Sequence, residues 1–253
     1  MAPIAISLLA FGLALVGIVL GSVMQRLLPE GHLSSDSKDV VKLSMGVVAT
    51  LAALVLGLLV ASAKGTYDAR ESEINQITAH VILLDNLLTK YGDEAHAART
   101  SLRQAVPRMV DRIWREGQSV SLESTPFKAT AEGEAFYQRV QELQPSNDIQ
   151  RGLKERVIQV TTDLAQARFL LFSHLGSSIP VPFLAVLLLW MIVLFAGFSL
   201  MAPANATTLA SLVICALSVS GAIFLILELD QPFSGIMVIQ SEPLRNALPA
   251  LSL

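Results

Sequence analysis

The sequence has little cysteine and little charge. Among 253 residues there is one cysteine, Cys215, and only 15% are charged. A single cysteine cannot form an intrachain disulfide or a cysteine-based metal cluster, and inside an apolar run it is expected to be a small buried hydrophobe. None of the four histidines has a second His or Cys three or four residues away, so no recognisable zinc motif and no metal site is predicted.

Motifs for catalysis are also missing. We find no glycine-rich phosphate loop, no Gly-x-Ser-x-Gly elbow and no Cys–His pair. The sequence therefore predicts no catalytic residues, no cofactor and no enzymatic activity.

Neither sign of charge is in excess, because 18 Lys and Arg face 21 Asp and Glu, for a formal net charge of -3. Without a basic surface or a stripe of basic and aromatic residues, nucleic acid is excluded as a partner. By contrast, 53% of the residues are hydrophobic and the mean hydropathy is +0.57. A chain this apolar is expected to expose much of its surface to the lipid bilayer.

Four apolar runs are free of Asp, Glu, Lys, Arg and His; they are 4–24, 43–63, 183–201 and 207–227. Runs of about 20 residues cross a bilayer as helices of about 30 Å. The first run contains Gly17 and Gly21, a spacing typical of close helix pairs in membranes. It lacks a basic start and a clean cleavage site, so we interpret it as a retained span rather than a signal peptide. Without ionisable groups at membrane depth, a proton-coupled pump is not expected.

The region between the second and third spans is expected to be a water-facing helical hairpin or bundle. From residue 64 to 178 it holds fourteen Lys and Arg and fifteen Asp and Glu. Gly92 is a candidate C-cap, Pro107 should kink or divide the following helix, and residues 118–130 have the composition of a loop. Two coiled-coil-like seams are expected to pack antiparallel: Ile74, Ile77, Val81, Leu84, Leu88 and Tyr91, and Leu153, Val157, Val160, Leu164, Ala167 and Leu171.

These patterns predict an all-α, four-span integral membrane protein with a helical region inserted between spans 2 and 3. Residues 1–63 hold spans 1 and 2, residues 64–179 the water-facing region, and residues 180–227 a tight hairpin of spans 3 and 4. A polar loop is expected over residues 26–42. The tail, residues 228–253, is expected to be irregular but packed through Phe233 and the apolar residues 236–239.

The second span carries two faces of different character. Small residues recur every fourth position, at Ala49, Ala53, Gly57 and Ala61 and then at Gly65. Such a ladder either packs closely against a neighbouring helix or faces a pore. On the opposite face lie Leu51, Val55, Leu58 and Ser62. A ring of Leu51, Val55 and Leu58 is a candidate hydrophobic constriction that gates by dewetting.

An acidic, sharply turned segment follows the fourth span. It contains Glu228, Asp230, Pro232, Phe233, Ser234 and Gly235. The two carboxylates either mark the membrane boundary and cap backbone donors or bind ions. This segment resembles the ending of the bestrophin-like (DUF4239) membrane proteins, and the order of two spans, a helical region and a hairpin of two spans is similar to theirs.

The resemblance implies an ion channel, because the family is similar to the bestrophins, oligomeric channels whose second span lines the pore. It further implies a homo-oligomer such as a pentamer, conduction of small inorganic ions, and cytoplasmic termini with residues 64–179 also cytoplasmic. A bacterial inner membrane is the expected location. The long acidic run that holds calcium in animal bestrophins is absent here, since only Glu228, Asp230 and Glu242 flank the turn, and the second span has no aromatic residue.

Two functions remain open at this level. The first is a bestrophin-like channel of undetermined ion sign. The second is a membrane-anchored helical sensor or scaffold without transport activity. Lys and Arg near the span ends number four on one face and three on the other, so charge does not orient the protein.

Overall fold

The computed structural model describes residues 3–28, 35–118, 131–173, 179–203 and 205–248. Within these ranges the chain forms helices and no β-strand, and four of the helices are long and apolar enough to cross a membrane. The predicted all-α, four-span class is therefore confirmed. The chain divides into two compact units: unit 1 is Met1–Thr66 with Ser177–Asp230, and unit 2 is Tyr67–Gly176 with Gln231–Leu253.

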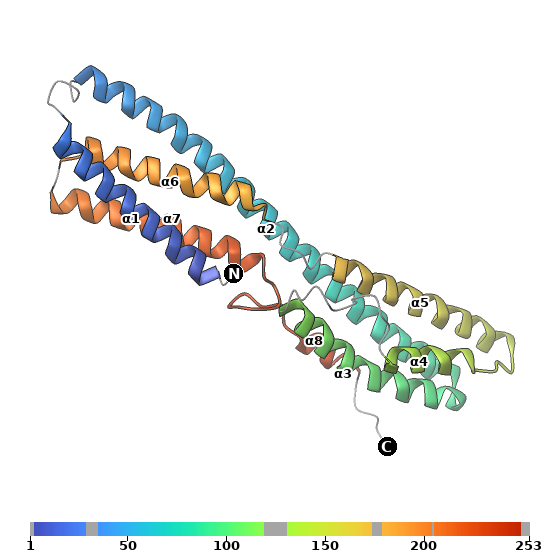
Figure 1. Ribbon diagram of the computed structural model, residues 1–253. Helices are drawn as coiled ribbons and strands as arrows, with labels where there is room; N and C mark the ends of the chain where they lie inside the picture. The colour runs from blue at the N-terminus through green and yellow to red at the C-terminus, as the bar shows by residue number, and fades with distance from the viewer. Residues whose placement is uncertain (1–2, 29–34, 119–130, 174–178, 204, 249–253) are drawn as a thin grey trace. The chain divides into compact units, whose positions relative to one another are not determined.

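Unit 1 contains the apolar helices (Figure 1). They are α1 (Pro3–Leu27), the first part of α2 (Ser35–Tyr91), α6 (Val181–Met201) and α7 (Ala206–Leu229). The loop predicted over residues 26–42 is wrong at its C-terminal end, because α2 already begins at Ser35. The physical reason is that serine and aspartate, which fill residues 34–37, are favoured where a helix begins.

Helix α1 packs very closely on α6. A Cβ atom added at Gly17 would lie 2.7 Å from the carbonyl oxygen of Ile192, and one added at Gly21 would overlap that of Ala196. Only glycine permits this approach of two backbones. The predicted close-packing role of Gly17 and Gly21 is therefore confirmed, with α6 as the partner helix.

Hydroxyl groups strengthen the packing of α1. The Ser199 hydroxyl on α6 donates to the carbonyl oxygen of Ile18 at 2.7 Å, and the Ser220 hydroxyl on α7 donates to that of Ser7 at 2.6 Å. Helix α7 begins after Asn205, whose side-chain oxygen accepts a hydrogen bond from the backbone N–H of Thr208. Because α1 contacts both α6 and α7, the three helices share one apolar core.

Unit 2 contains the rest of α2, the 3₁₀ turn η2 (Asp93–Ala95), α3 (His96–Gln118), α4 (Ala131–Gln141), α5 (Asp148–Ser173) and α8 (Glu242–Arg245). Both predicted seams lie in its core, where every residue of the α2 seam is buried and the α5 seam is buried from Val157 to Leu171. Within this unit α5 runs antiparallel to α2, as predicted (Figure 1).

Local signals account for most helix ends in unit 2. Helix α2 ends at Tyr91, and the following Gly92 has a φ of 113°, a conformation that favours glycine. The Asn147 side chain accepts from the backbone N–H of Gln150 and begins α5. Pro107, however, does not divide α3, which continues from His96 to Gln118. A proline has no backbone N–H to bond the carbonyl oxygen four residues earlier. Because Pro107 lies on the exposed side of α3, water can reach this side of the helix in place of that donor. The predicted loop lies, apart from Gln118, outside the described residues.

The tail packs less completely than predicted. Phe233, Ile239 and Leu244 are buried in unit 2, but Ile236 is 79% exposed and Met237 and Val238 are also exposed. The backbone N–H of Ile239 donates to the carbonyl oxygen of Pro232 at 2.8 Å, which closes a turn between them. Residues 235–238 lie on the exposed side of this turn, so the expectation of packing is wrong for residues 236–238.

Candidate functional site

The membrane part of α2 uses one face to contact the other helices of unit 1. Met45, Leu59 and Ala63 are buried there, and the sulfur of Met45 occupies the space beside Gly197 of α6. Val55 is half-buried and packs against the same apolar core. Among the four candidates of the leucine face, Val55 is thus the one that contacts its own chain.

The other three candidates of that face, Leu51, Leu58 and Ser62, are exposed. Leu54, which sequence reasoning did not single out, is 66% exposed, more than either Leu51 or Leu58. Together with Val47, which is also exposed, these leucines form a four-three-four spacing along the helix. Leu54 follows Leu51 by three residues and precedes Leu58 by four, so helical periodicity could have placed it on the same face as those two leucines. We call Val47, Leu51, Leu54 and Leu58 the outer seam.

The small-residue ladder is also turned away from the helices of unit 1. Ala53, Gly57 and Ala61 are exposed, and Ala49 is half-buried. A Cβ atom added at Gly57 would meet no described atom within 4 Å, in contrast to Gly17 and Gly21 on α1. The described part of the chain therefore offers the ladder no close-packed partner, and whether it faces a second subunit or a pore stays a prediction.

The membrane part of α2 offers little polar chemistry. Ser44 and Thr50 are exposed, but each hydroxyl donates to the backbone carbonyl four residues earlier, at 2.9 Å. No ionisable side chain lies between Leu43 and Ala63. The exposed surface of this span therefore offers apolar side chains and hydroxyl oxygens but no fixed charge.

The acidic segment begins at the C-terminal end of α7. Glu228 lies in the last turn and Asp230 follows the helix; both belong to unit 1, and both are buried. The backbone N–H of Asp230 donates to the carbonyl oxygen of Ile226 at 3.2 Å. A helix C-terminus carries partial negative charge, so two buried carboxylates at this end require favourable contacts, and each residue makes at least one polar or electrostatic contact.

The second half of the segment is fixed to α3 within unit 2. The ring of Phe233 meets the ring of Trp114 edge to face, with centroids 5.6 Å apart and planes at 84°. The Trp114 indole N–H donates to the carbonyl oxygen of Ile239 at 3.0 Å. Ser234 donates its backbone N–H to Gln231 at 3.1 Å, and Gly235 has a φ of 92°. Pro232 and Phe233 are buried, so this half of the motif stabilises a turn.

Trp114 was missed by sequence reasoning. Its partner Ile239 is 125 residues away, so no local pattern connects them. The available signal was the single tryptophan of an amphipathic helix, since an indole on the packed side of a helix needs an acceptor for its N–H.

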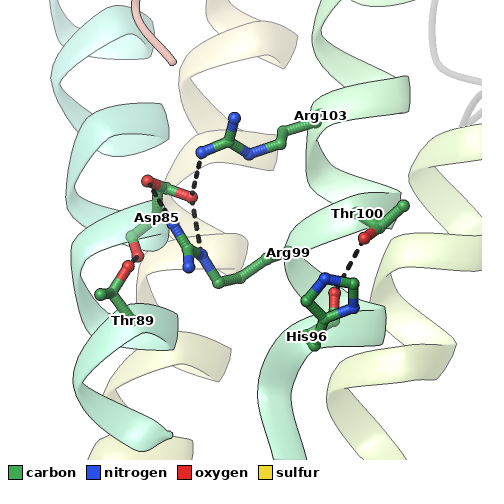
Figure 2. Close-up of polar contacts among 6 residues, drawn as sticks. All are labelled: Asp85, Thr89, His96, Arg99, Thr100 and Arg103. Carbon is green, nitrogen blue, oxygen red and sulfur yellow. Dashed lines mark hydrogen bonds and ion pairs between the residues drawn. The ribbon is translucent and has the colours of Figure 1, made fainter. Parts of the chain in front are cut away.

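A second missed cluster joins α2 to α3 (Figure 2). Asp85 is buried and receives two bonds from Arg99, Nε to Oδ1 at 3.1 Å and Nη2 to Oδ2 at 3.2 Å. Arg103, one helical turn further, places Nη2 3.5 Å from Asp85 Oδ1. Because Arg99 binds the carboxylate with two hydrogen bonds and Arg103 adds a second positive charge, this cluster holds α2 and α3 together within unit 2. Although this region was predicted to face water, its charged residues are not all solvated, because Asp85 is buried.

The described residues contain no group of three or more His, Cys, Asp or Glu side chains arranged to hold a metal ion. Cys215 is exposed on α7, so the expectation of a buried cysteine is wrong within this single chain. His80 and His96 lie on different helices of unit 2, and His174 and His32 are outside the described residues.

A family model described as the Bestrophin-like domain matches residues 11–244. This match includes all four apolar helices in whole or in part and the acidic segment after α7. No curated protein and no solved structure matches the chain significantly.

Proposed function

Since the chain belongs to the Bestrophin-like domain family, we propose that it forms a homo-oligomeric ion channel whose pore is lined by α2. The observation that carries this proposal is the outward face of α2. The outer seam and the small-residue ladder both point away from the chain's other membrane helices, so both are available to neighbouring subunits or to a pore axis.

The constriction is proposed at Leu51, Leu54 and Leu58. Their side chains are exposed along one edge of α2, whereas Val55 packs against its own chain. Rings of leucine from several subunits would form a narrow apolar segment that excludes water when closed. The ladder of Ala53, Gly57 and Ala61 would then let neighbouring subunits approach closely. The permeant species are small inorganic ions, and the span supplies no charged ring that would select their sign.

The proposed location is a bacterial inner membrane, with the termini and residues 64–179 in the cytoplasm. Family membership supports this orientation, which the charge distribution leaves open. A reporter fused after Gly117 should be active only when it is cytoplasmic, and an external reporter signal would contradict the orientation.

Flux measurements with purified protein in liposomes test the channel. We expect salt-gradient-driven ion flux above that of empty vesicles. Leu54→Ser should raise the flux, because a hydroxyl makes an apolar constriction easier to hydrate. Leu217→Ser on α7 is the matched control, since Leu217 is similarly exposed, at 62% against 66%. Absence of flux under every salt gradient would remove the channel, and equal flux in the two variants would remove the constriction.

A membrane-anchored sensor or scaffold is the competing function. It is favoured by the size of unit 2, whose described residues form the distal part of α2 and five further helical elements. A monomer without flux that retains a folded unit 2 would support this function over the channel.

A further inference from the structure

Unit 2 contains a cavity of about 200 Å³ between its helices. Helices α2, α3, α4 and α5 each contribute to its wall, and the wall is mainly apolar. The apolar residues are Val81, Leu102, Ala105, Val106, Met109, Phe136, Leu164 and Ala165. Cavities between the helices of a bundle are common positions for small-molecule sites.

We propose that this cavity binds a small uncharged aromatic molecule that carries one hydroxyl group. All residues of its wall belong to unit 2, and the site does not depend on the proposed channel activity. The argument rests on the size of the cavity, the charge of its wall and the hydrogen-bonding capacity of two wall residues.

The size fits one substituted ring. An apolar cavity of about 150 Å³ lined by leucine, isoleucine and phenylalanine stays dry and binds benzene. The present cavity is somewhat larger, so it has room for a ring with a small substituent. The room exists because one small residue from each of three helices lines it, namely Ala105 on α3, Gly133 on α4 and Ala165 on α5.

The charge of the wall favours a neutral ligand. The wall has one negative residue, Glu134 on α4, and one positive residue, Arg168 on α5. Their formal charges sum to zero, so the wall carries no excess charge of either sign that would offset the charge of an ion. A charged ligand would lose its hydration without an equivalent gain.

Two hydroxyl groups of the wall are suited to a ligand hydroxyl. Tyr137 accepts a hydrogen bond from the Gln141 amide at 2.9 Å, which leaves its own proton free to donate. Thr161 donates to the carbonyl oxygen of Val157 at 2.7 Å, which leaves its oxygen free to accept. A ligand hydroxyl could accept from Tyr137 or donate to Thr161.

Binding of 4-fluorophenol and fluorobenzene to the full chain in lipid nanodiscs tests the site, with ¹⁹F NMR titration as the readout. We expect saturable binding of 4-fluorophenol, one molecule per chain. Ala105→Leu should weaken it at least tenfold by filling the cavity, whereas Ala97→Leu, at an exposed position of the same helix outside the cavity, should leave it unchanged. Ala165→Leu, at the exposed mouth, serves if Ala105→Leu does not fold.

Two further comparisons test the chemistry. Tyr137→Phe should weaken 4-fluorophenol by roughly 2- to 12-fold and leave fluorobenzene unchanged, because only the phenol uses that hydrogen bond. The ions 4-fluorobenzoate and 4-fluorobenzylammonium should bind at least tenfold more weakly than 4-fluorophenol. Non-saturable uptake that is equal in the wild-type chain and both filled variants would show partition into lipid and overturn the site. Equal or tighter binding of either ion would overturn the neutral ligand.

Discussion

Replacing Gly21 by alanine should force α1 away from α6. The added Cβ would overlap the carbonyl oxygen of Ala196 and lie 2.8 Å from the Cβ of Ser199. The first obstacle is backbone, which cannot rotate away as a long side chain can. The helices themselves must therefore separate.

The magnitude follows from three contributions. Overpacking of a close contact costs about 1–3 kcal/mol. Separation also stretches the bonds of Ser199 to the Ile18 carbonyl at 2.7 Å and to the Ser22 hydroxyl at 2.8 Å, and such interhelical bonds average about 0.6 kcal/mol each in membranes. Alanine favours a helix over glycine by about 1 kcal/mol, which opposes both. The net loss in the free energy of unfolding should be about 1–3 kcal/mol.

Unfolding by increasing dodecyl sulfate in mixed micelles, followed by circular dichroism, measures this loss. Gly12→Ala is the matched control, because Gly12 lies on the same helix and has no atom within 4 Å of an added Cβ. We expect Gly12→Ala to unfold at the wild-type dodecyl sulfate fraction or slightly above it, and Gly21→Ala clearly below it. Coincident transitions for the two variants would refute the close contact between α1 and α6.

Three further predictions concern unit 2. Asp85→Asn leaves Arg99 and Arg103 without their carboxylate and should lower the free energy of unfolding by about 1.5–3 kcal/mol in thermal denaturation. Asp39→Asn, whose ion pair with Lys42 is exposed, should change it by less than about 0.5 kcal/mol. Trp114→Phe keeps a ring beside Phe233 but loses the bond to Ile239, so thermolysin should cleave within residues 236–238 faster than in the wild type. Burial, and to a smaller extent the Glu94 carboxylate, raise the pKa of the Tyr91 hydroxyl above 10.0. The folded state therefore holds this proton more tightly than the unfolded state and loses stability as the pH rises past 10.0. Tyr91→Phe should move alkaline unfolding to higher pH.

The membrane helices could be predicted from sequence because their cause is local. A charged group inside a bilayer is costly, so a span appears as a continuous apolar run wherever it lies in the chain. The seams of α2 and α5 were equally visible, because helical periodicity places their residues on one face. Gly17 and Gly21 predicted a close helix pair in the same way, although the identity of the partner helix required the structure.

The missed features depend on contacts between distant residues. The Trp114 bond to Ile239 and the Asp85 bond to Arg99 join separate helices or turns, and the pattern of one segment carries no information about the other. Periodicity shows which residues share a helix face, but it does not show what that face contacts. It grouped Val55 with Leu51 and Leu58, but the direction in which this face turns depends on where α6 and α7 pack, and Val55 proved to lie at its inner edge.

Cysteine substitution can decide which outward face of α2 contacts a neighbouring subunit. In a Cys215→Ser background, which removes the native thiol, Gly57→Cys and Leu54→Cys place one thiol on the ladder and one on the outer seam. Disulfides form only when Cα atoms lie about 4.4–6.8 Å apart, and a charged methanethiosulfonate reagent reaches only thiols in contact with water. If the ladder joins subunits and the leucines face the pore, Gly57→Cys should cross-link and Leu54→Cys should react with the reagent. The opposite result would exchange the two faces, and failure of both residues to cross-link or react would contradict a pore lined by α2.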